Sequence, residues 1–214
     1  MVKRELNAIN FHNEFMDCIR QGVENKGDWV ESKERYHDKF TDYVNKKLMP
    51  KCFEKFATGY SNEYYRFDVS SWEQLKSSVE DICKEVKMTP YLWDLRIAFE
   101  HENSKKDWFD EVIKLLYIDC PLKVVVGYNN YKKRFNEKYD ESDKSKLNAL
   151  CLILSKLNRI KDLLSKNEFL IILGNCGSGY DNNEGAEYFG YKGYRLYIEE
   201  GKVKYKNIED QLWK

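Results

Sequence analysis

The sequence lacks several features that would assign it to a specialised class of protein. No run of apolar residues reaches the ~18 that a membrane span needs, and the basic N-terminal segment has no apolar region of the signal-peptide kind. We therefore expect no membrane partner and a cytoplasmic location. The 36 basic residues balance the 36 acidic ones, so any anionic partner must be held by local patches and not by net charge.

The six cysteines are well separated and form no Cys-x-x-Cys pair, which argues against a zinc ribbon. Most have apolar neighbours, as in ALCLIL, so we expect buried free thiols and not a disulfide framework. Repeats, linkers and low-complexity segments are also missing. The 214 residues suit a single domain of moderate size, with N-terminal helices in 1–50, a core in 60–175 and a C-terminal hairpin in 188–208.

The sequence does contain alternating helical and strand-like patterns. Apolar residues at helical spacing predict helices over 3–21, 28–48 (ending before Pro50), 71–86, 105–118 and 141–165. Alternation or short apolar runs predict strands at 64–70, 91–102, 122–128 and 169–175, and a hairpin over 191–208 that turns at Glu200-Gly201. This order predicts an α/β fold with a central mixed sheet flanked by helices.

The strand at 91–102 ends in an unusual sequence, Glu100-His101-Glu102. Residues i and i+2 of a strand project from the same face, about 6.5–7 Å apart, so Glu100 and Glu102 point to one side and His101 to the other. Carboxylates that close to about 4 Å repel by roughly 4 kcal/mol at an effective dielectric constant of 20, and a shared divalent cation reverses that sign. Oxygen ligands suit Mg²⁺ or Mn²⁺, so the pair predicts a metal site. The alternative is a solvated strand edge paired with lysines.

A third acid has two possible sources. Asp94 falls on the predicted face of Glu100, but about 20 Å away along the same strand, so a salt bridge to a nearby cation suits it better. Asp68 belongs to a different predicted strand, which the sheet can place beside Glu100. Asp68 also has a competing structural role as a turn or N-cap acid for the helix predicted to start at Ser70 or Ser71.

The order of these elements resembles the PD-(D/E)xK restriction-endonuclease-like nucleases over roughly residues 60–128. In that family an acid on one strand precedes an acidic pair on the next, then a helix and an apolar strand. The pair is usually Asp/Glu-x-Lys, and Glu100-His101-Glu102 matches the variant with Glu in place of Lys. Asp68 matches the first acid, although Phe67 and not Pro precedes it. The resemblance implies a restriction-endonuclease-like fold and a Mg²⁺-dependent endonuclease with Asp68, Glu100 and Glu102 as metal ligands.

The missing motif lysine would normally position or deprotonate the attacking water. Lys114 on the following helix, or Lys123 at the start of the next strand, could project back toward the site, a substitution that resembles those in related families. If neither does, Glu102 would act as base or second-metal ligand. Glu111, one turn before Lys114, is a candidate to support the metal ligands indirectly.

Basic and aromatic residues interleave at 128–139 and 191–207, which suits phosphate contacts and base stacking but equally an ordinary solvated surface. We expect Lys132, Lys133 and Arg134 to touch the backbone of a nucleic acid, DNA in the first place, and the resemblance allows a homodimer that cuts two strands. The loop 174–179 lacks the Gly-Lys-Ser/Thr ending of a phosphate loop. His12 and His37 are expected at the surface.

Two other functions stay open on the sequence. One is a catalytically degenerate nuclease fold that acts as a binding or assembly module in a defence or mobile-element system, which the zero net charge and the missing lysine favour. The other is a metal-dependent hydrolase of a small molecule.

Overall fold

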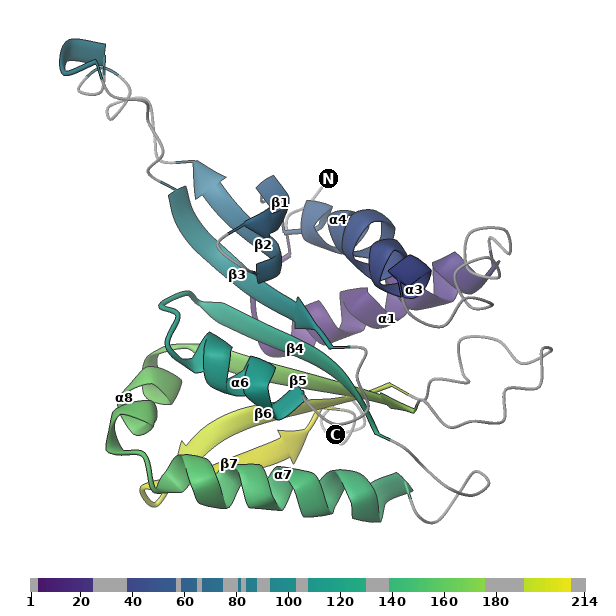
Figure 1. Cartoon of the computed structure of the whole chain (residues 1–214), viewed down its shortest axis with the longest axis vertical. Coiled ribbons are helices and arrows are strands. Elements are labelled where there is room, and N and C mark those ends of the chain that lie inside the picture. Colours follow the sequence, from purple (N-terminus) through teal and green to yellow (C-terminus); the bar gives the residue numbers. More distant parts are fainter. Residues whose placement is uncertain are drawn as a thin grey trace.

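The computed structural model describes residues 4–24, 38–56, 59–64, 67–74, 81, 84–87, 93–102, 108–129, 139–175 and 191–208. Within these ranges the chain forms a seven-stranded mixed sheet with helices on both faces (Figure 1). The predicted α/β class is confirmed. No helix in the described ranges is long and apolar enough to cross a membrane.

The strands lie across the sheet in the order of the sequence. They are β1 (Gly59–Tyr64), β2 (Phe67–Gln74), β3 (Trp93–His101), β4 (Leu122–Asn129), β5 (Glu168–Asn175), β6 (Lys192–Glu199) and β7 (Lys202–Asn207). β1, β2 and β3 are antiparallel neighbours, β3, β4 and β5 are parallel, and β5, β6 and β7 are antiparallel again. Parallel neighbours need crossovers, which here carry α6 (Trp108–Leu116), then α7 (Tyr139–Ser155) and α8 (Asn158–Lys166).

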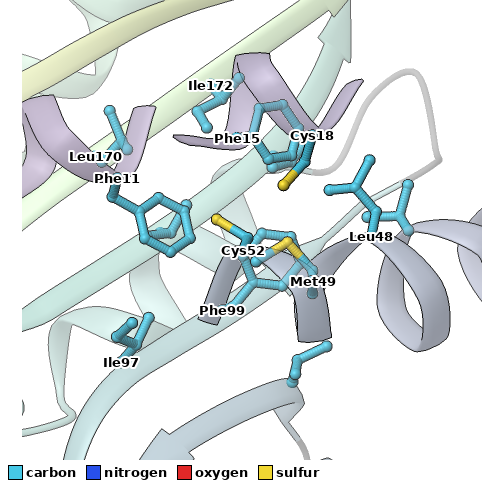
Figure 2. Packing of buried hydrophobic residues seen from close by; sticks show 14 of the residues in the cluster. Phe11, Phe15, Cys18, Leu48, Met49, Cys52, Ile97, Phe99, Leu170 and Ile172 are labelled. Carbon is cyan, nitrogen blue, oxygen red and sulfur yellow. The ribbon is translucent and has the colours of Figure 1, made fainter. Parts of the chain in front are cut away.

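Two hydrophobic clusters cover the two faces of the sheet. One face carries α1 (Ala8–Glu24), α3 (Asp38–Tyr43), the π-helical turn η1 (Val44–Leu48) and α4 (Met49–Glu54). Figure 2 shows Phe11 and Phe15 of α1 packed with Phe99 of β3 and Leu170 of β5. The opposite face is covered by α6, α7 and α8. All eight residues of β4 are buried because both layers cover this strand, as its apolar run predicts.

The structure confirms three features predicted from local sequence: the buried side of α6, the hairpin turn and the buried free cysteines. Helix α6 buries the four residues that its helical spacing points inward, which are Trp108, Val112, Leu115 and Leu116. The hairpin turns at Glu200-Gly201 with φ of 50° and 69°, the left-handed values that a tight two-residue turn requires. The described cysteines, Cys18, Cys52, Cys120 and Cys151, are free and buried, as expected.

The helix predicted to start at Ser70 or Ser71 is wrong at its start. Both serines lie buried within β2, where they pair with Ala98 and Ile97 of β3. The single strand predicted over 64–70 is divided between two strands, because β1 ends at Tyr64 and β2 begins at Phe67. Pairing with a buried strand has outweighed the local signals of a helix start.

The predicted helices at 28–48 and 141–165 also differ from the structure. Pro50 does not end the first, because it lies in the first turn of α4, where the N–H that proline lacks would have no helical partner. The second is divided in two by Leu157, whose extended backbone (φ −96°, ψ 99°) precedes α8. Leu157 is 38% exposed and does not join the buried stripe. His12, expected at the surface, is buried against Gly193 of β6.

The predicted alternation along β3 holds only near its carboxyl end. The pairing with β2 shifts between Ser71 and Trp72, which face Ile97 and Leu95, so the register skips Arg96. A bulge of this kind reverses the face of every residue before it. Leu95 accordingly packs with the α6 side of the sheet and Ile97 with the α1 side. Asp94 therefore does not share the face of Glu100, contrary to the prediction.

Candidate active site

Asp68 and Glu100 are neighbours on adjacent strands. Val69 of β2 pairs with Phe99 of β3, so the antiparallel register places the next residue along, Asp68, beside Glu100. Asp68 Oδ2 also accepts a hydrogen bond of 2.7 Å from the backbone N–H of His101. The alternative role of Asp68 as a cap for a following helix is excluded, because β2 continues through Ser70 to Gln74.

Lys114 reaches from α6 to these carboxylates. Its Nζ lies 2.5 Å from Glu100 Oε1 and 3.1 Å from Glu111 Oε2. The first contact is an ion pair by its distance. The geometry follows from α6, whose buried apolar side holds the helix on the sheet and leaves Lys114 at its rim, 35% exposed.

The cluster of Asp68, Glu100, Glu111 and Lys114 contains three acids and one base, of which Glu100 is buried and the other three are half-buried. Burial, opposed by the contact with Lys114 and supported by the charges of Asp68 and Glu111, raises the pKa of Glu100 to about 8. Burial also raises the pKa of Asp68, despite the hydrogen bond from His101. Burial lowers the pKa of Lys114, but its contacts with Glu100 and Glu111 outweigh this, so that its pKa is raised.

Two other predicted site residues, Lys123 and Glu102, are not among the four residues of this cluster. Lys123 lies beside Ala98, in the part of β4 that precedes the partner of Glu100, and the charges that affect it are those of Cys120 and Asp119. Burial lowers the pKa of Lys123. Of the two lysines considered, the structure therefore brings Lys114 to the carboxylates. Glu102 directly follows β3, half-buried, and its backbone N–H donates to Val126 O at 2.9 Å.

His101 lies in the core on the other face of β3, as strand alternation predicts. Its Nε2 lies 2.8 Å from the hydroxyl of Tyr128, which in turn lies 2.8 Å from that of Tyr191. Burial lowers the pKa of His101 to about 3, so the ring is neutral near pH 7. His101 is a core histidine: its ring takes no part in the carboxylate cluster, which it contacts through its backbone N–H.

A second buried polar cluster, at the carboxyl end of β4, has no counterpart in the sequence predictions. Asn129 donates to Asp143 of α7 and accepts from Trp108 Nε1 at 3.3 Å and from Lys146. The hydroxyl of Tyr194 in β6 donates to Asp143 Oδ2 at 3.0 Å. In the sequence Asp143 looks like an ordinary acid in the polar first turns of a helix, so nothing local marks it. The cluster joins α6, α7 and β6 to the end of β4.

The residues predicted to contact nucleic acid, Lys132, Lys133 and Arg134, lie outside the described residues, as does the loop after Asn175. The described residues include no group of three or more His, Cys, Asp and Glu side chains that could enclose a metal ion. Asp68 and Glu100 still fit Mg²⁺, because this cation usually takes one or two protein carboxylates and completes its shell with water and substrate phosphate.

The chain gave no match to a family model, to a curated protein or to a solved structure.

Proposed function

We propose that the chain is a metal-dependent nuclease with a restriction-endonuclease-like fold. It would hydrolyse phosphodiester bonds of nucleic acid, with DNA as the expected substrate. The observation that carries this proposal is the meeting of Asp68, Glu100 and Lys114 on one face of the sheet. They come from β2, β3 and α6, and the order β2–β3–α6–β4 agrees with the order of elements in the resemblance.

Each residue has a distinct role in the proposed reaction. Asp68 and Glu100 would hold Mg²⁺ or Mn²⁺, with Glu102 as a further ligand or as the base. The bound cation would polarise the phosphoryl oxygen, activate water and stabilise the leaving oxygen. Lys114 would orient the attacking water or stabilise negative charge that develops on the phosphate. Glu111, 3.1 Å from Lys114, would hold that lysine near the site.

The electrostatics of the cluster support a site that takes a cation. An acid in a structural ion pair usually has a lowered pKa, whereas the pKa of Glu100 is raised to about 8 although Lys114 is in contact with it. The protein's own cation therefore does not compensate the burial and the neighbouring acids. Carboxylates with such perturbed pKa values are concentrated at functional sites.

Two observations favour the alternative of a degenerate nuclease fold that serves as a binding or assembly module. Lys114 already forms a short ion pair with Glu100, so the cluster can persist as a structural feature without a metal. The formal net charge of zero also provides no general attraction to nucleic acid. On this view the protein would bind its partner and cut nothing.

A cleavage survey separates the two functions. The protein is incubated with plasmid, single-stranded DNA and RNA, in Mg²⁺, Mn²⁺ or EDTA, beside Asp68→Asn and the control Asp94→Asn, an exposed acid at the far end of β3. We expect cleavage that needs the metal, is lost in Asp68→Asn and is retained in Asp94→Asn. Cleavage unchanged in Asp68→Asn would remove the proposed site. No cleavage, together with no Mn²⁺ binding by calorimetry, would support the binding module.

A further inference from the structure

The ammonium group of Lys114 lies among carboxylates, where a divalent cation would otherwise be expected. It contacts Glu100 at 2.5 Å and Glu111 at 3.1 Å, and its charge also acts on Asp68. Glu100 is only 2% exposed, so the contact with Lys114 occupies one of its two oxygen atoms in a place that little solvent reaches.

We propose that Lys114 is a built-in counter-cation that holds the metal-free site closed and must leave Glu100 before a divalent cation binds there. The inference rests on the proposed function, because it assumes that Asp68 and Glu100 form a metal site. It adds a form of regulation: metal binding and the contact between Lys114 and Glu100 exclude each other.

The exclusion follows from distance and charge. A divalent cation binds a carboxylate oxygen at about 2.1 Å, so on Glu100 Oε1 it would stand within about 5 Å of the ammonium that now contacts this atom. Two like charges so close repel strongly in a site with little water. The metal would therefore compete with Lys114 for Glu100, and its apparent affinity would be lower than the carboxylates alone would give.

Lys114 has a route out of the site that leaves the helix in place. It stands in the last turn of α6, and its side chain is 35% exposed. The flexible four-carbon stem of lysine allows the ammonium to swing toward solvent. Trp108, Val112 and Leu115 remain buried and keep α6 on the sheet during that movement. Glu111 offers the displaced ammonium a second partner, since it already lies 3.1 Å away.

Calorimetric titration with Mn²⁺ tests the competition directly. The wild type is compared with Lys114→Met, which removes the charge, and with Lys114→Gln, which removes the charge but keeps a hydrogen-bond donor. The control is Lys46→Met, which removes an ion pair of 2.7 Å between exposed side chains of η1 and α3. We expect both Lys114 variants to bind Mn²⁺ at least tenfold more tightly than the wild type, and the control to bind with unchanged affinity. Equal or weaker binding in the Lys114 variants would overturn the inference.

Lys114→Arg keeps the inference testable if the neutral variants fail to fold. Arginine retains the positive charge, so its Mn²⁺ affinity should stay within a few-fold of the wild type. Tenfold tighter binding by the arginine variant would overturn the inference, because the charge would then not be the cause. Thermal unfolding of each variant, with and without Mn²⁺, gives a second readout: Lys114→Met should gain more in melting temperature from Mn²⁺ than the wild type does.

The outcomes distinguish this inference from the proposed function. Mn²⁺ binding by the wild type without tighter binding by the Lys114 variants would remove the competition and leave the metal site. Absence of Mn²⁺ binding in the wild type and in all Lys114 variants would remove both. Tighter Mn²⁺ binding by Lys114→Met, combined with undiminished cleavage, would support the competition and remove the proposed role of Lys114 in the reaction.

Discussion

The wild-type protein should become less stable as the pH rises, because Glu100 then loses its proton in a buried place. Glu100→Gln should not show this loss of stability. The folded protein holds the proton of Glu100 more tightly than the unfolded chain does, because its pKa is raised from 4.5 to about 8. The stabilising effect of this proton is complete below pH 4.5 and is lost as the pH rises to about 8. Glutamine is a neutral counterpart of the protonated acid at every pH, so Glu100→Gln should escape this loss.

The structure sets the size of the effect. At about 1.4 kcal/mol per pKa unit, the shift of Glu100 corresponds to a loss on the order of 5 kcal/mol between pH 4.5 and pH 8. Entry of water and adjustment of Lys114 on ionisation relieve part of this cost. We therefore expect the free energy of unfolding of Glu100→Gln, relative to wild type, to rise by about 2–4 kcal/mol between pH 5 and pH 8.

Urea unfolding of the metal-free proteins in EDTA at pH 5, 6.5 and 8 measures this difference. Taking the difference between variant and wild type cancels the titration of His12 and His101, which both proteins share. Asp94→Asn is the matched control, because Asp94 is exposed in the same strand and its charge is screened by water. Parallel pH profiles for Glu100→Gln and wild type would refute the electrostatic description of the site.

Three further predictions test other parts of the fold by urea unfolding. Burial, with a smaller effect of Arg20, lowers the pKa of His12 to about 4, so the folded state loses stability as the pH falls from 6.5. His12→Gln should reduce the difference in the free energy of unfolding between pH 7 and pH 4.5 by about 2 kcal/mol, and an unchanged difference would contradict this. Gly127→Ala should cost about 1–3 kcal/mol at pH 7, because a Cβ there would lie 2.6 Å from Trp108 Cβ; a neutral result would contradict that packing. Ser155→Ala should cost about 1 kcal/mol by removing the 2.9 Å hydrogen bond to the Val203 N–H, whereas Ser165→Ala, which loses an exposed bond, should be near neutral.

Much of the sheet was predictable because its central strands contain long apolar runs. β4 and β5 are buried on both sides, and such runs leave little choice of structure. Local sequence signals fail to predict the structure at Ser70 and Ser71. Their side chains suit a helix start, but pairing with β3 places them in a strand, and that pairing depends on residues far away in the sequence.

The candidate site shows the same division between local and distant information. Strand alternation was enough to separate Glu100 from His101, and the position of Asp68 on another predicted strand was enough to suggest it as a neighbour of Glu100. It was not enough to choose between Lys114 and Lys123, because that choice depends on how α6 lies on the sheet. The bulge at Arg96, which moves Asp94 to the other face, also has no signal in the sequence. The buried cluster around Asn129 and Asp143 depends on four elements at once, β4, α6, α7 and β6.

The proposed nuclease centre is tested most directly by metal-dependent cleavage in two matched variants of β3. Single-turnover cleavage of one susceptible substrate in Mn²⁺ is compared for wild type, Glu100→Gln and Asp94→Asn. We expect Glu100→Gln to lower the rate at least about a hundredfold, as loss of one strong electrostatic stabiliser does, and Asp94→Asn to cleave at the wild-type rate. Equal rates for the three proteins would contradict this.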